Sequence, residues 1–189
     1  MNARRLVLVE RTSTQEFDRF AEDRGWQRVA LSIGPDDDVD ADRPSTLWRT
    51  PAGSVRFVDD TVIGCQYAEP KTNDDEADLR AGFVCYDRDE AVMALDLDGS
   101  QEVVRRGYRF IAGAAIGDPA GGVIAATVRG LNHERSDVRE SALIVPQYTS
   151  WTDFLPVIVQ VDEQDPDPEV RRIAGGIRML LETTAQMQS

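Results

Sequence analysis

The stretches SDVRESA, at residues 136–142, and DPEVRRIA, at residues 167–174, each place an acidic residue shortly before a valine and an arginine. Each valine is followed, four and seven positions later, by a residue that can face a core: Val138 by Ala142 and Val145, and Val170 by Ala174 and Ile177. This spacing puts the three residues on one side of an α-helix. Both stretches therefore predict an amphipathic helix that starts near the acidic residue.

Two weaker copies of this pattern lie upstream, and each has an apolar residue directly before an arginine. Their core-facing positions are Leu79, Phe83 and Tyr86 in one copy, and Val104, Tyr108 and Ile111 in the other. Successive copies start 25, 34 and 32 residues apart. Such spacing is typical of repeats built from helix pairs. The segments between the copies are apolar enough to supply the partner helices, at residues 90–97, 121–131 and 154–161.

Prolines mark where some of these helices should start and end. Pro146 should end the helix that starts near Val138, because proline removes a backbone donor from a helix. If Asp153 caps the next helix, Pro156 falls in its first turn, where a missing N–H costs little. The run Asp165-Pro166-Asp167-Pro168 should start the last helix in the same manner, with acidic residues near the positive end of its dipole.

An acidic residue, an apolar residue and an arginine at the start of the first helix of each pair resembles HEAT repeats. The resemblance is to the short HEAT-like repeats named after phycobilisome lyase subunits, and it covers at most residues 75–186. The first two copies fit less well, since Val103 replaces the acid and Gly82 and Gly107 weaken the helices. Stacked pairs would bury the valines, and each arginine would reach a carboxylate or carbonyl of the preceding repeat. The arginines of this predicted ladder are Arg80, Arg105, Arg139 and Arg171.

The N-terminal part of the chain has a different pattern. A short strand is expected within residues 4–10, and a helix should run from Ser13 or Thr14 to Gly25. Val29, Leu31 and Ile33 alternate as in a half-buried strand, and an acidic loop follows at residues 36–44. Three further β-prone runs occupy residues 46–49, 55–58 and 61–67. We therefore predict an α+β protein with a small α/β domain at residues 1–70, a boundary within residues 69–78, and a HEAT-like helical stack at residues 75–186.

The net charge of −13 arises from 34 acidic and 21 basic residues among 189. Residues 1–70 contain 13 acidic and 9 basic residues, and residues 71–189 contain 21 and 12, so the excess is not confined to a tail. An acidic surface repels phosphate backbones and anionic lipid, which disfavours nucleic-acid and membrane partners. It would attract a basic protein, although solubility alone can explain it. No membrane span or signal peptide is recognisable, and the two isolated cysteines, Cys65 and Cys85, favour a reducing cytoplasm.

Few residues indicate catalytic or metal chemistry. His133 is the only histidine and lies in a polar loop, and no nucleophile elbow, zinc-protease or phosphate-loop motif occurs. Asp36, Asp38, Asp40 and Asp42 alternate as in a calcium loop, but Ala41 and Leu47 occupy the positions of the required glycine and glutamate. The glycines between Gly113 and Gly122 favour close helix packing over a phosphate site. We predict no catalytic residue, no metal and no cofactor.

These observations favour a non-catalytic module that binds a protein partner. The resemblance implies contact through the inner face formed by the second helices, and the candidate contacts are Gln147, Tyr148, Trp151 and Asp153. Such aromatic side chains are enriched in binding sites, but they are more commonly core residues at a helix junction. Two alternatives stay open: an immunity-type inhibitor of a basic toxin, and a lyase-like or ligand-carrying subunit. The sequence leaves the oligomeric state undefined.

Overall fold

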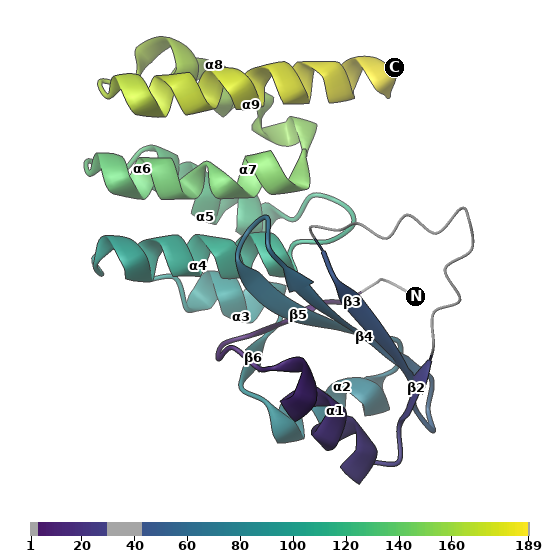
Figure 1. Ribbon diagram of the computed structural model, residues 1–189. Coiled ribbons are helices and arrows are strands. Elements are labelled where there is room, and N and C mark those ends of the chain that lie inside the picture. Colours follow the sequence, from purple (N-terminus) through teal and green to yellow (C-terminus); the bar gives the residue numbers. More distant parts are fainter. Residues whose placement is uncertain (1–3, 30–42, 189) are drawn as a thin grey trace. The chain divides into compact units, whose positions relative to one another are not determined.

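The computed structural model describes residues 4–29 and 43–188, and their contacts divide the chain into two units, Met1–Arg88 and Asp89–Ser189. The protein is α+β, as predicted: among the described residues, six strands form one sheet in the N-terminal unit, and helices form the C-terminal unit (Figure 1). The predicted boundary segment, residues 69–78, holds the end of β5 and part of α2, and both elements belong to the N-terminal unit.

The sheet has the strand order β2-β3-β4-β5-β1-β6, and every neighbouring pair is antiparallel. The strands are β1 (Leu6–Leu8), β2 (Gln27–Val29), β3 (Ser45–Arg49), β4 (Ser54–Asp60), β5 (Cys65–Pro70) and β6 (Cys85–Tyr86). Val7 pairs with Tyr67 on one side and Tyr86 on the other, so the first strand lies inside the sheet. This position explains why all three residues of β1 are buried.

The expected strands are present, with two differences in extent. The run at residues 61–67 becomes β5 only from Cys65, because the Asp60 carboxylate accepts the amides of Val62 and Ile63 and Gly64 has a left-handed φ of 66°. These contacts make a turn at the start of the run. The predicted strand through Val29 is observed as β2, whereas its residues Leu31 and Ile33 and the aspartates of the calcium-like loop lie outside the described residues.

Helix α1 (Thr14–Asp23) supplies one side of the core of the N-terminal unit. Ser13 and Glu16 form a capping box at its start, and Gly25, with a φ of 69°, follows its end. Phe17 is fully buried, and its ring lies 4.4 Å from the ring of Phe57 and 4.8 Å from that of Trp48. The core of this unit is therefore an aromatic cluster between α1 and the sheet.

The first copy of the arginine-marked pattern is not a helical stripe, which corrects the sequence prediction. Helix α2 (Asn73–Gly82) ends before Phe83, whose backbone is extended, and Tyr86 lies in β6. The chain changes to strand here because β1 has an open edge, and the Val9 amide donates to the Val84 carbonyl. The pairing of β1 with β6, two strands far apart in sequence, is a tertiary effect that local spacing does not reveal.

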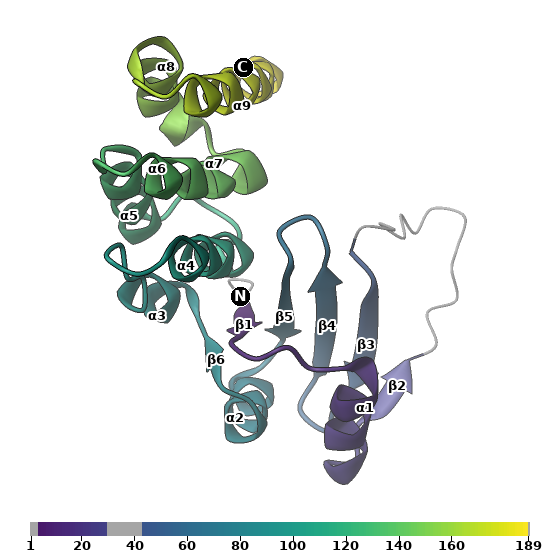
Figure 2. The same cartoon turned by 60° about the vertical axis from the view of Figure 1, so that its left-hand side comes forward.

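The C-terminal unit contains three helix pairs. They are formed by α3 (Arg88–Met93) with α4 (Gln101–Ala114), α5 (Gly121–Leu131) with α6 (Ser136–Ala142) and α7 (Ile144–Thr149), and α8 (Leu155–Gln164) with α9 (Pro168–Met187). A short 3₁₀ helix, η1 (Thr152–Phe154), precedes α8. Figure 2 shows two rows, with α3, α5 and α8 in one and α4, α6, α7 and α9 in the other. Each pair packs on the next, since α6 and α7 contact both α4 and α9.

The other three stripes are buried, as the spacing predicted. Their residues, all within 3% exposure, are Val104, Tyr108 and Ile111 on α4, Val138, Ala142 and Val145 on α6 and α7, and Val170, Ala174 and Ile177 on α9. However, the arginine-marked helix is the second member of each pair. Helix α9 packs most extensively against α8, which precedes it.

Pro146 breaks a helix instead of ending it. Helix α6 stops at Ala142, and α7 starts two residues later with Pro146 inside its first turn. A proline leaves the carbonyl four residues earlier without its donor, and that residue is Ala142. The row of second helices is therefore interrupted in the middle pair, and α7 ends at Thr149, just before Ser150, which has a left-handed φ of 54°.

Candidate protein-binding surface

Arg139 and Asp165 form a buried ion pair. It lies at the edge of the helical unit that holds the loops joining the two helices of a pair. The Arg139 side chain is 8% exposed and the Asp165 side chain 3%. The guanidinium donates to both carboxylate oxygens, at 2.7 and 3.0 Å, and to the carbonyls of His133 and Glu134, at 2.9 and 2.8 Å. Because Asp165 precedes α9, this side chain ties the middle pair to the last one.

The remaining predicted ladder arginines have different partners. Arg105 on α4 donates to Glu140 on α6, at 3.1 Å, and Arg171 donates to the carbonyl of Asp165. Arg80 belongs to the N-terminal unit, where it binds Glu76 and Asp87. Arg105 and Arg139 therefore contact the following pair, whereas the sequence-based expectation was the preceding repeat.

Arg135 is a ladder residue that the sequence analysis missed. Its guanidinium donates to the carbonyls of Leu97 and Gly99, in the loop before α4, and to both oxygens of Asp137. Backbone carbonyls carry no sequence signal, which is why this contact could not be read from residue types. The only sequence clue to this role is that Arg135 directly precedes a copy of the motif.

The ladder shifts the titration of its carboxylates. Burial alone would raise the pKa of Asp165, but the bonds from Arg139 and from the Asp167 amide hold it below the usual value. The bond to Arg135 likewise lowers the pKa of Asp137. Both carboxylates are therefore ionised and bonded at neutral pH, so these two ion pairs stabilise the fold.

His133 is part of this edge as well. Its Nδ1 accepts the Arg135 amide at 3.2 Å, and its carbonyl accepts Arg139. In the described part of the chain, no three His, Cys, Asp or Glu side chains come together as metal ligands. The role that these contacts give His133 is to shape the loop before α6.

The candidate contacts in α7 and η1 differ in exposure. Gln147 and Asp153 are exposed, and Tyr148 is half-buried. Trp151 is only 8% exposed, its ring is stacked on Phe154, and its indole N–H donates to the Gly117 carbonyl at 3.1 Å. The Trp151 side chain therefore closes the junction between α7 and η1, and only the other three residues reach the surface.

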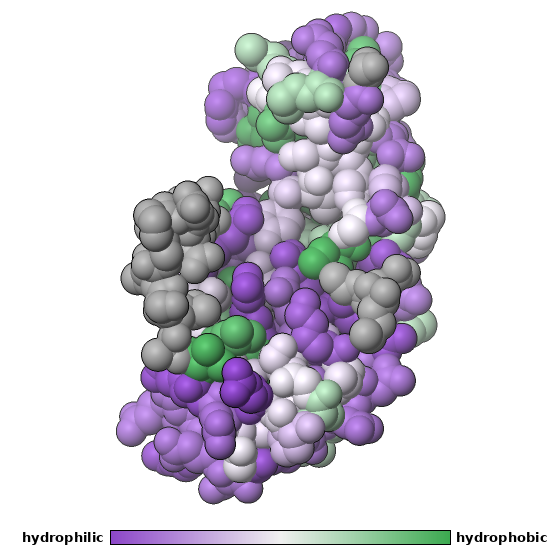
Figure 3. Space-filling view, turned by 90° about the vertical axis from the view of Figure 1, so that its right-hand side faces the viewer, coloured by the Kyte–Doolittle hydropathy of each residue, from purple (hydrophilic) through white to green (hydrophobic). Residues whose placement is uncertain are grey.

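Helix α9 exposes a second apolar face that the sequence analysis did not single out. Its exposed large side chains are Met179 (70%), Leu180 (40%) and Met187 (76%). Met179 lies opposite the buried stripe of α9, and Leu180 and Met187 lie on its flank. Figure 3 shows white and pale green residues among the hydrophilic ones near the C-terminal end of the helical unit. A second apolar series, through Ile173, Leu180 and Met187, was the available sequence signal.

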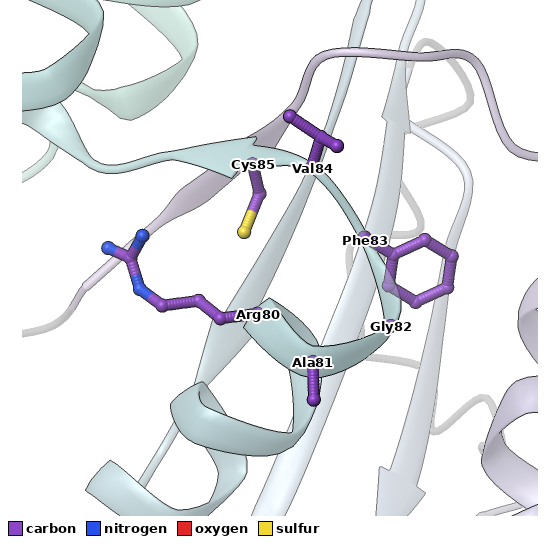
Figure 4. A pocket seen from close by; sticks show the side chains of 6 residues that line it. All are labelled: Arg80, Ala81, Gly82, Phe83, Val84 and Cys85. Carbon is purple, nitrogen blue, oxygen red and sulfur yellow. The ribbon is translucent and has the colours of Figure 1, made fainter.

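A surface hollow in the N-terminal unit is lined by both Cys85 and Arg80. It is lined by residues 80–85, and Figure 4 shows the Cys85 thiol and the Arg80 side chain on its same side. Cys85 is buried, and the Arg80 guanidinium is held by two carboxylates. No acid or base among the lining residues could activate the thiol, so the hollow gives no basis for a reaction.

Comparisons with protein-family models, with curated proteins and with solved structures found no match. Within residues 4–29 and 43–188, no helix combines the length and the hydropathy that crossing a membrane would require.

Proposed function

We propose that this chain is a non-catalytic protein-binding module, and that its helical unit is a HEAT-like repeat array that docks a protein over α7 and α9. The arginine-marked stretches support the HEAT-like part of the proposal, because three of them start helices that stack in pairs. Bonds from Arg105 to Glu140 and from Arg139 to Asp165 link neighbouring pairs, although toward the following pair and not toward the preceding one that the resemblance implies.

The observation that carries the proposal is the group of exposed apolar side chains in the C-terminal half of α9. A 20-residue helix at the surface normally presents charged or polar residues to water, yet α9 exposes Met179, Leu180 and Met187 there. Exposed apolar groups gathered on one face are typical of protein interaction sites. Gln147 lies on α7, which packs against α9, and would extend the contact with a polar side chain.

A reducing, cytoplasmic setting belongs to the same proposal. Both cysteines are buried and neither is part of a disulfide, which suits a compartment where thiols stay reduced. The partner on the α9 face would bury methionine and leucine side chains. Methionine is adaptable in shape and makes favourable contacts with many apolar groups, so the face is suited to another helix.

The test is a capture experiment with the purified full chain. Immobilised wild-type protein and the variant Met179→Asp are each incubated with a lysate of the source cells. The control variant, Gln160→Asp, adds the same charge at an exposed position of α8. We expect proteins retained by the wild type and the control, and lost from Met179→Asp. Equal retention by all three chains, or retention of nothing, would contradict the proposal.

A further inference from the structure

The last helix pair packs mainly on itself. Helices α8 and α9 contact each other more extensively than any other two helices, whereas each of them contacts the middle pair much less. The first and middle pairs are joined more closely, because α4 packs along both α6 and α7. The junction between the middle pair and the last pair is therefore the weaker of the two junctions in the stack.

The chain enters the last pair through an irregular link. Pro146 breaks the row of second helices, α7 has only six residues, and Ser150 follows it with a left-handed φ of 54°. This backbone conformation is unfavourable for a residue with a side chain. The Trp151 indole fastens the link to the Gly117 carbonyl, in the loop between the first and middle pairs. Residues 149–151 thus form a short, anchored connection, which is the kind of segment that absorbs the rotation in a hinge.

The chain crosses this junction once, through η1, and the Arg139–Asp165 ion pair bridges its opposite edge. Figure 1 shows the link through η1 on the right of the stack and the loops that join paired helices on the left. At the other junction, Arg135 bridges the corresponding edge by donating to the Leu97 and Gly99 carbonyls. Because both junctions have an arginine at this edge, the difference in helix packing decides which of them can open.

We propose that the last pair, from η1 to α9, swings as one body about residues 149–151, and that the Arg139–Asp165 pair holds it closed. Helices α7 and α9 lie on the two sides of this hinge, so the motion changes the shape of the surface over which the proposed function docks a protein. A protein that contacts both helices would select one hinge angle. The hinge itself belongs to the free chain, and its test does not depend on the proposed function.

Distances between pairs of spin labels on the free chain test the hinge. The substitutions Asn132→Cys and Gln164→Cys place labels at exposed positions across the hinged junction, and Asp98→Cys with Asn132→Cys does so across the other junction. The buried Cys65 and Cys85 are replaced by alanine in every chain. The two distances measured without further substitution give the closed reference for each junction.

Matched lysine variants then test the ion pair. Arg139→Lys keeps a positive charge beside Asp165 but cannot make two parallel bonds to its carboxylate. We expect it to shift the distance across the hinged junction to longer values, with the ratio of open to closed chains raised about tenfold. Arg135→Lys makes the same change at the other junction. It should leave the distance there unchanged, because α4 holds both α6 and α7.

A third distance separates swinging from local unfolding. Labels introduced by Gln160→Cys and Gln186→Cys, at exposed positions of α8 and α9, should keep their distance in Arg139→Lys, because the last pair moves as one body. Loss of that distance would overturn the hinge. So would an unchanged distance across the hinged junction in Arg139→Lys, or equal shifts at the two junctions. None of these results would bear on the capture experiment, which tests the docking of a protein separately.

Discussion

Each of the two units of this chain is stabilised internally by a different kind of contact. In the N-terminal unit, strands far apart in sequence pair with each other, as Val7 does with Tyr67 and Tyr86, over a single aromatic cluster. In the helical unit, each pair contacts mainly the next, and buried polar bonds such as Arg139–Asp165 join the loops. The first arrangement concentrates stability in a few large side chains, and the second distributes it along the stack.

The largest effect is expected from the aromatic cluster. Phe17→Ala should reduce the free energy of unfolding of the N-terminal unit by about 3–5 kcal/mol, because it removes a fully buried ring and leaves a cavity. Hydrogen exchange read by mass spectrometry should show lost protection in β4 and β5. The exposed neighbour Gln15→Ala serves as the control. Equal loss of protection in α8 and α9 would show that the units do not differ in this way.

Removing the buried arginine should have a somewhat smaller effect, confined to the other unit. Arg139→Ala leaves Asp165 buried without its charge partner, which should cost the helical unit about 3 kcal/mol. The same exchange experiment should report it in α6 and α9. The control is Arg172→Ala, because the Arg172–Glu169 pair is exposed and screened by water, so its loss should change stability little. Similar losses in the two variants would remove the buried pair from the explanation.

Lowering the pH should weaken the buried ion pair but not the aromatic cluster. The pKa of Asp165 is lowered in the folded state, so its contribution is complete above the unfolded value of about 3.9 and is lost as the pH falls through the lower folded value. The penalty of Arg139→Ala should therefore be constant from pH 7 to about 5 and shrink below about pH 4. Phe17→Ala removes no titrating group, so its penalty should not decrease with pH as that of Arg139→Ala does. Urea unfolding at each pH measures both.

How much the sequence predicted follows from the same contrast. The stripes starting at Val104, Val138 and Val170 were legible because a helix buries residues at a fixed local spacing. The same spacing misled at Leu79, where the unpaired edge of β1 turned the following residues into β6. Of the candidate contacts, Gln147 and Asp153 could be placed at the surface, but the burial of Trp151 depends on the distant Gly117 carbonyl. The arginine-marked helix was also predicted to be the first of each pair and is the second, because spacing alone does not show which neighbouring helix it packs against.

The smallest effect concerns Gly175 and Gly176, which local propensity treats alike. Gly176→Ala should stabilise the helical unit by about 0.5–1 kcal/mol, because alanine restricts the unfolded chain and its methyl group meets open space. Gly175→Ala should gain nothing, because its methyl group displaces Asp162 from the position in which it accepts Arg178. Thermal unfolding of dilute, monomeric protein would measure both changes. Equal gains would mean that the approach of α8 to Gly175 is loose, and equal losses would mean that Gly176 is already covered within the chain.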